Sequence, residues 1–258
     1  MKTTGLAIAL ACALSACGGG GGGDGGVSPA SASIAACYTA AKDVSFASED
    51  EEGVSKTSIT HDTFDGQAAT LQTTYISFTS PTGQITNRSE TTYWNVTASG
   101  VMNLGWVTVT EAVDNTRTVD INGVPTPLTY TYTGISTPDP APVIPLNMQP
   151  GQSIDQQYTL HGVINTVTNN GLDSPGQETQ LSYANHYTFV GFETVTLAGK
   201  TFSNVCHFKI QTLTLDGTEQ PATNYDEEWA APGYGPIKAS YRDAAGNDHI
   251  VMQYAGNL

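Results

Sequence analysis

Hydrophobic and polar positions alternate with a period of two along most of this chain, which predicts strands rather than helices. From Leu71 onward, short runs rich in Thr, Tyr, Val and Ile follow one another, and these residue types favour strands. Asn122-Gly123 lies between two of the runs and is the strongest hairpin signal in the chain. We therefore predict an all-β, antiparallel fold: a twisted sheet, half-barrel or sandwich of about ten to twelve short strands.

The pattern locates the expected strands with some precision. The range 205–215 alternates most clearly, with Cys206, Phe208 and Ile210 on one face. The expected strands that follow this range are separated by only a few residues, which predicts a C-terminal antiparallel meander. The expected strands are 44–47, 71–79, 91–97, 101–110, 117–121, 129–133, 154–167, 181–197, 205–215, 225–230, 237–242 and 249–254.

Two segments depart from the strand pattern. Residues 35–41 are a candidate short helix, although tyrosine and threonine are indifferent helix formers. Residues 137–145 contain four prolines and predict a stiff, extended connector. That connector is either a boundary between two domains or a rigid crossover within one.

The start of the chain follows the order typical of an exported protein. Lys2 precedes an apolar run from Leu6 to Leu14, and a small residue, Ala16, stands just before Cys17. This arrangement indicates a secretory signal peptide. The run is too short for a transmembrane helix, which needs about 20 apolar residues.

Leu14-Ser15-Ala16-Cys17 resembles the lipobox of bacterial lipoproteins. In that family the cysteine thiol receives a diacylglycerol, the peptide is cut before it, and the new amino end is acylated. The resemblance implies a signal peptide at 1–16, lipidation at Cys17 and a flexible Gly-, Ser- and Pro-rich tether at 17–33. In Gram-negative lipoproteins, a residue other than aspartate after the lipidated cysteine favours release to the outer membrane. The glycine at position 18, by this resemblance, favours that location. The alternative is plain secretion with Cys17 unmodified.

The chain has four cysteines, of which Cys12 leaves with the signal peptide and Cys17 takes the lipid. Cys37 and Cys206 remain, and an exported chain meets an oxidising compartment, so we predict a disulfide between them. The alternative is two buried free thiols. The bond crosses the proline connector and therefore favours a single body over residues 34–258.

A second resemblance covers roughly residues 143–258. Gly199 and Phe202, followed by the run Trp229 to Lys238 with Pro232, Gly233 and Gly235, resemble a pattern in uncharacterised bacterial secreted proteins and lipoproteins. Residues 145–151 resemble the segment that introduces it. The resemblance implies an antiparallel β fold and brings no established activity. Physically, the glycines allow a tight turn and Trp229 covers one end of the core.

No catalytic or metal-binding motif stands out. The chain lacks a nucleophile elbow, a His-Glu-x-x-His pair, a Walker loop and a dinucleotide fingerprint. Its five histidines are far apart, and we interpret His207 and His249 as outward-facing surface residues. The acidic run Glu49 to Glu52 lacks the ligand spacing of a calcium loop and is interpreted as a solvated loop.

Three carboxylates, Asp226, Glu227 and Glu228, precede Trp229. Paired carboxylates beside an aromatic ring are a feature of sugar hydrolysis. Neighbouring strand residues point to opposite faces, so only Asp226 and Glu228 can share one. We assign no catalytic role to them, and we predict neither a metal nor a cofactor.

The charge balance, 24 Asp and Glu against 9 Lys and Arg with a net charge of −15, narrows the range of partners. Nucleic acid and anionic lipid would both repel such a surface, which leaves the acyl anchor as the predicted membrane contact. Our preferred interpretation is a non-catalytic binding or assembly module of the cell envelope, with an envelope protein as candidate partner. The alternatives are a carrier of an apolar ligand in a half-barrel, and an unrecognised hydrolase. A deep apolar pocket favours the carrier, and converging polar side chains favour the hydrolase.

Overall fold

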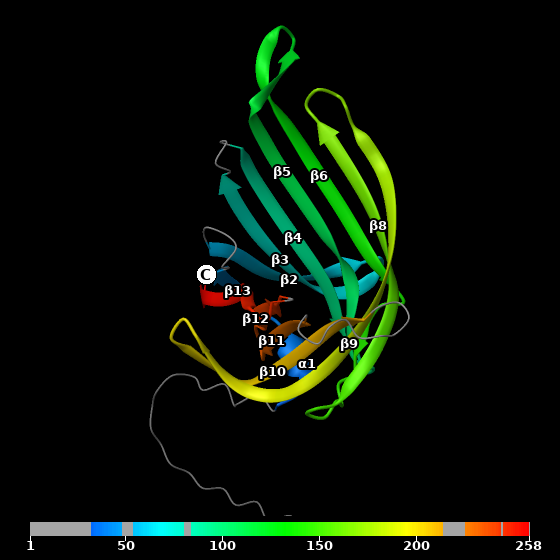
Figure 1. The fold of residues 1–258 in the computed structure, drawn as a ribbon, viewed down its shortest axis with the longest axis vertical. Helices are drawn as coiled ribbons and strands as arrows, with labels where there is room; N and C mark the ends of the chain where they lie inside the picture. Colours follow the sequence, from blue (N-terminus) through cyan, green and yellow to red (C-terminus); the bar gives the residue numbers. More distant parts are fainter. Residues whose placement is uncertain (1–31, 48–53, 80–83, 214–224, 244, 258) are drawn as a thin grey trace, which may run out of the picture.

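The protein folds into long antiparallel strands and one short helix (Figure 1). The structure is a computed structural model, and it describes residues 32–47, 54–79, 84–213, 225–243 and 245–257. Its elements are α1 (Ile34–Tyr38), β1 (Val44–Ala47), β2 (Val54–Phe64), β3 (Gln67–Thr79), β4 (Ile85–Val96), β5 (Val101–Ile121), β6 (Val124–Asp139), β7 (Val143–Ile144), β8 (Ser153–Thr168), β9 (Ser174–Leu197), β10 (Lys200–Leu213), β11 (Tyr225–Ala231), β12 (Gly235–Arg242) and β13 (Asp248–Asn257).

The strands form a single sheet that closes on itself. Their order is β4-β3-β2-β1-β13-β12-β11-β10-β9-β8-β6-β5, and pairing of β4 with β5 completes a barrel of 12 strands. The two-residue strand β7 adds to the end of β5. The predicted antiparallel all-β fold and the C-terminal meander, β9 to β13, are therefore confirmed, and the sheet closes where a half-barrel would stay open.

Several strands are far longer than the sequence pattern predicts. β5 spans 21 residues and β9 spans 24. The Asp114-Asn115 pair separates the expected strands 101–110 and 117–121, but in the structure it lies in a bulge of β5, where the Asp114 carboxylate accepts a hydrogen bond from the Thr116 amide. Gly191 likewise lies at a bulge of β9. An extra residue in one strand bends the sheet and leaves the ladder intact on both sides.

Two-residue turns join several of these strands. Asn122 and Gly123, with φ of 54° and 81°, form the predicted turn between β5 and β6. Asp65 and Gly66 form an equivalent turn with φ of 48° and 75°. Positive φ at both central residues matches the twist of the flanking strands. The β2–β3 hairpin that Asp65-Gly66 connects was missed at the sequence level.

The short helix α1 closes one end of the barrel and acts as a plug (Figure 1). The Ser33 hydroxyl caps it by accepting a hydrogen bond from the Ala36 amide. Ile34, Cys37 and Tyr38 share one helix face and are buried. The helix contacts β5 on one side and β10, β11 and β12 on the other. Because β5 and β11 are almost opposite each other in the ring, α1 lies across the barrel.

A disulfide bond joins this plug to the barrel wall, as predicted. Cys37 on α1 bonds to Cys206 on β10, with the two Cα atoms 6.1 Å apart and a sequence separation of 169 residues. Both cysteines are fully buried within the main hydrophobic cluster, together with Phe189, Phe208 and Trp94. The start of the described body is thereby tied to its C-terminal third.

A second hydrophobic cluster fills the space between the β9–β10 hairpin and β1, β11, β12 and β13. Phe202 makes edge-on contacts with Tyr234 and Tyr254, at ring-centroid distances of 5.2 and 5.0 Å. Gly235, the first residue of β12, lies close to the segment that follows the plug. A Cβ atom at Gly235 would lie 3.2 Å from the Ala40 Cβ, so the turn after Trp229 lets the chain pass close to α1.

Two predictions fall outside the described residues, namely Cys17 with its signal and the tether up to residue 31, and the acidic run Glu49 to Glu52. Among the helices of the described ranges, none has the length and apolar character needed to cross a membrane.

Replacing both Cys37 and Cys206 with alanine should lower the free energy of unfolding by up to about 5 kcal/mol, because the bond restrains a very long loop in the unfolded chain. Urea unfolding followed by tryptophan fluorescence measures the change. Intact mass after thiol alkylation, with and without reductant, provides the control. Alkylation of both cysteines without reductant would contradict the bond itself.

Candidate functional site

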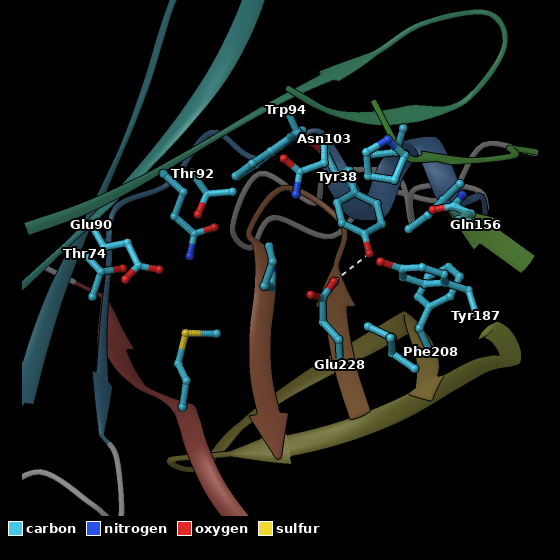
Figure 2. A pocket seen from close by; sticks show the side chains of 17 residues that line it. Tyr38, Thr74, Glu90, Thr92, Trp94, Asn103, Gln156, Tyr187, Phe208 and Glu228 are labelled. Atoms are coloured by element: carbon cyan, nitrogen blue, oxygen red, sulfur yellow. Dashed lines mark hydrogen bonds between the residues drawn. The ribbon is translucent and has the colours of Figure 1, made fainter. Parts of the chain in front are cut away.

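A cavity of about 390 Å³ lies inside the barrel beside the plug (Figure 2). Side chains from α1 and from ten of the strands line it. Because alternate residues of each strand point into the barrel, distant parts of the chain contribute single side chains to one wall. This volume falls in the range of small-molecule sites, about 300–1,000 Å³.

Tyr38 and Glu228 form the polar base of the cavity. Tyr38 is the last residue of α1, and its hydroxyl donates a 2.6 Å hydrogen bond to the Glu228 Oε1 atom (Figure 2). Glu228 lies on β11 opposite Phe208 of β10. Glu228 as a whole residue is partly exposed, and it lines the cavity. A carboxyl group therefore faces the interior of the barrel beside an aromatic ring.

The surroundings of this pair favour its neutral forms. Burial raises the pKa of the Glu228 carboxyl, and the Tyr38 hydrogen bond opposes that rise without cancelling it. Burial, together with the Glu228 charge, raises the pKa of the Tyr38 phenol well above its usual range. None of the described residues that line the cavity is a lysine, arginine or histidine. Within this described wall, Glu228 thus has no cation beside it.

The facing wall comes from β3 and β4, where Gln72 pairs with Thr92 and Thr74 pairs with Glu90. Gln72 is only 8% exposed, and its Oε1 atom has no hydrogen-bond partner among the described residues. The Thr74 hydroxyl, by contrast, lies 3.1 Å from the Thr57 hydroxyl and is hydrogen-bonded. Most buried polar atoms in proteins have partners, so an orphaned amide oxygen at a cavity wall calls for an explanation.

Arg88 and Glu90 of β4 form an ion pair on the wall of the cavity that faces Glu228. The Arg88 Nη2 atom donates to the Glu90 Oε2 atom at 2.6 Å, and both side chains are more than a third exposed. Glu90 lines the cavity, whereas Arg88 lines a second hollow of about 460 Å³ between β4, β5, β6, β8 and β9. Glu90 is therefore neutralised within the described part of the protein, and Glu228 is not.

Further polar and aromatic groups complete the lining. The Gln156 Nε2 atom donates to the Val143 carbonyl at 2.5 Å, and its Oε1 atom is buried without a partner in the described chain. The Trp94 ring is fixed because its Nε1 atom donates to the Tyr38 carbonyl at 2.8 Å. Tyr187 and Phe208 add two more rings (Figure 2). The cavity therefore offers hydrogen-bond acceptors between aromatic faces.

The residues expected to matter from the sequence lie mainly outside this cavity. Gly199, with φ of 77°, forms the β9–β10 turn, and Phe202 and Trp229 belong to the second hydrophobic cluster. Pro232 and Gly233 lie in the turn between β11 and β12, beside the plug, where the Gly233 carbonyl accepts a hydrogen bond from the Ala41 amide. These residues form turns and part of the hydrophobic core.

His207 departs from the expected surface position. Its ring stacks on Trp229 at a centroid distance of 4.4 Å, and its two nitrogens lie 3.5 Å from Glu193 and 3.6 Å from Glu227. Its side chain is only 13% exposed. Alternation placed it correctly on the face opposite Phe208, but that face is covered here because Trp229 and Glu193 pack over it. Burial lowers the pKa of His207.

The cavity residues were not identified from the sequence. Glu228 carried the clearest signal, because it shares an alternating face with Ala230 and its neighbour Glu227 points away toward His207. The sequence held no signal for Gln72, Glu90 and Thr92 as cavity residues, since threonine and glutamine in a strand usually face solvent. No group of three or more His, Cys, Asp or Glu side chains suited to a metal occurs among the described residues.

Comparison of the chain with protein-family models, with curated proteins and with solved structures gives no match. The cavity and its lining are therefore the basis for assigning a function to the barrel.

Glu228→Gln should stabilise the protein at neutral pH, because glutamine still accepts the Tyr38 hydrogen bond and carries no charge to bury. The folded-state pKa of Glu228 is raised, so its contribution to stability is present below the unfolded pKa of about 4.3 and is lost as pH rises through the folded value. Urea unfolding from pH 4 to 8 should show the variant more stable at pH 7, with the difference shrinking toward pH 4.

Glu227→Gln is the matched control for this series, since it removes the neighbouring charge from the opposite face. It should not reproduce the pH-dependent gain. A Glu228→Gln variant that is less stable than the wild type across the whole pH range would contradict the assignment.

Proposed function

We propose that this chain is a lipid-anchored binding module of the cell envelope, which holds a small polar ligand inside its barrel without catalysing a reaction on it. The observation that carries the proposal is the Gln72 Oε1 atom, buried at the cavity wall with no partner among the described residues. A buried acceptor without a hydrogen bond costs about 1–3 kcal/mol. A ligand with a donor group would remove that penalty on binding.

The lining argues against the alternative of an apolar cargo. Glu228, Gln72 and Gln156 all line the cavity, and the buried Oε1 atoms of the two glutamines have no partner among the described residues. A hydrocarbon ligand would exclude water from these groups and leave them unpaired, which is unfavourable. A ligand that combines polar groups with some apolar surface fits the rings and the oxygens together.

The hydrogen-bonded pair at the base also favours binding over hydrolysis. A nucleophile needs a lowered pKa or an adjacent base that takes its proton. The pKa of the Tyr38 phenol is raised, and the pKa of its partner Glu228 is raised as well. The Tyr38 hydrogen bond therefore orients the Glu228 carboxyl and does not prepare the phenol for attack.

The lipobox residues Leu14 to Cys17 and the glycine run after them support attachment to the membrane. The proposed tether, 17–33, leads directly into α1, so the anchor would reach the barrel through its plug. With glycine at position 18, the outer membrane is the proposed location.

Cells expressing the wild-type chain should incorporate a palmitate analogue into this protein, and Cys17→Ser should abolish the labelling because no thiol remains to receive the acyl chain. In-gel detection after immunoprecipitation provides the measurement. Cys12→Ser serves as the control, since that residue leaves with the signal peptide. Equal labelling of the Cys17→Ser and wild-type proteins would overturn the anchor.

Filling the cavity tests the binding site. Thr92→Trp places a large ring inside the cavity, whereas Thr91→Trp places the same ring on the other face, where Thr91 contacts Thr73. Native mass spectrometry of protein purified from the envelope should find a bound small molecule in the wild type and in Thr91→Trp. Circular dichroism confirms folding. An unchanged bound mass in folded Thr92→Trp, or no bound mass in the wild type, would count against a ligand in the barrel.

A further inference from the structure

We propose that the ligand is a small organic cation that carries N–H donors, with Glu228 as its counterion in the barrel. This inference rests on the proposed function and adds the chemical class of the ligand. It depends on the charge of the cavity, on the unpartnered amide oxygens and on the rings between them.

The cavity has negative character with no positive charge in its described wall. Its two acidic lining residues are Glu228 and Glu90, and the described lining contains no lysine, arginine or histidine. Glu90 has Arg88 as its partner at 2.6 Å. The described residues place only the Tyr38 hydroxyl against Glu228, a neutral donor. An anionic ligand would meet repulsion from Glu228, whereas a cation would supply the missing charge.

Two buried amide oxygens of cavity-lining glutamines favour a ligand that donates hydrogen bonds. Gln72 is more than nine-tenths buried, and its Oε1 atom has no partner in the described ranges. The Gln156 amide nitrogen already donates to the Val143 carbonyl, so the Gln156 Oε1 atom is left as a hydrogen-bond acceptor without a partner in the described chain. A primary ammonium group has three donors, enough for Glu228 and for amide oxygens.

Aromatic side chains provide the rest of the surface. Trp94, Tyr187 and Phe208 line the cavity together with the Tyr38 ring (Figure 2). Ring faces attract cations, by about 0.5–1 kcal/mol when exposed and by about 2 kcal/mol when water is excluded. The alkyl part of an organic amine packs against the same rings. A hydrated metal ion would not use this surface.

Binding of a cation has a consequence for protons. Tyr38 on α1, Tyr187 on β9 and Asp226 on β11 are the titratable groups that act on Glu228 or share its surroundings. All three have raised pKa values, with burial as the main cause. A cation beside Glu228 stabilises its ionised form, so binding should release a proton wherever Glu228 is protonated in the free protein. Affinity should then increase as pH rises through the Glu228 pKa.

Isothermal titration calorimetry of the full-length mature protein in detergent micelles tests the charge selection. Butylamine is the probe, with butanol and butyrate as its neutral and anionic counterparts of similar size. Butylamine should bind at least tenfold more tightly than either. Titrations in two buffers of different ionisation enthalpy should show proton release on butylamine binding, smaller at pH 8 than at pH 5.

Glu228→Gln should reduce butylamine affinity at least tenfold, to the level of butanol, and should abolish the proton release. The variant is expected to fold at least as stably as the wild type, so a loss of binding is not a loss of structure. Glu227→Gln removes an adjacent charge on the opposite face and should leave the affinity unchanged.

Three outcomes would overturn the inference: no butylamine binding, equal binding of butanol or butyrate, or undiminished binding by Glu228→Gln. Butanol or butyrate binding that Thr92→Trp abolishes would refute charge selection while leaving the barrel as the binding site. If native mass spectrometry finds a bound envelope molecule without a basic nitrogen, that result would likewise refute selection for a cation and leave the barrel as the binding site.

Discussion

A five-residue helix that lies across the barrel determines most of what is distinctive in this structure. It is held by the Cys37–Cys206 bond to β10, by the Trp94 hydrogen bond from β4, and by the Tyr38 hydrogen bond to β11. These attachments come from different sides of the ring, so they fix the distance between its walls. The cavity exists because α1 fills one end of the barrel and leaves the adjoining space empty.

The site opposes stability in a way that is typical of binding sites. A carboxyl group and two amide oxygens lie in places where apolar side chains would pack more favourably. Proteins retain such groups where a ligand uses them, and the unfavourable energy of the empty site then becomes part of the binding energy. Glu228 faces the cavity while the rings around it form the core, so the proposed binding surface and the core share the same wall.

The sequence was sufficient for the fold class and for the disulfide. Period-two alternation identifies strands, and one pair of cysteines remains once Cys12 is assigned to the proposed signal peptide and Cys17 to the proposed lipid anchor. Barrel closure was not predictable, since it requires β1 to pair with β13, more than 200 residues later in the chain, and depends on bulges and twist summed over many strands. The cavity was hidden for the same reason: Gln72, Thr92 and Glu228 are far apart in the chain and meet only once the ring closes.

The disulfide also determines how the molecule would bear a mechanical load. With the chain anchored at Cys17 as proposed, tension between the membrane and a partner of the barrel enters the fold at Ser33 and reaches Cys37 within one turn of α1. The covalent bond to Cys206 then passes that tension into β10, which is hydrogen-bonded to β9 and β11 on its two sides. The chain after Cys37, including Tyr38, lies outside this covalent path, whereas β9, β10 and β11 carry the cavity residues Tyr187, Phe208 and Glu228. Tension on the proposed anchor would therefore reach the cavity through its wall and not through the end of the plug.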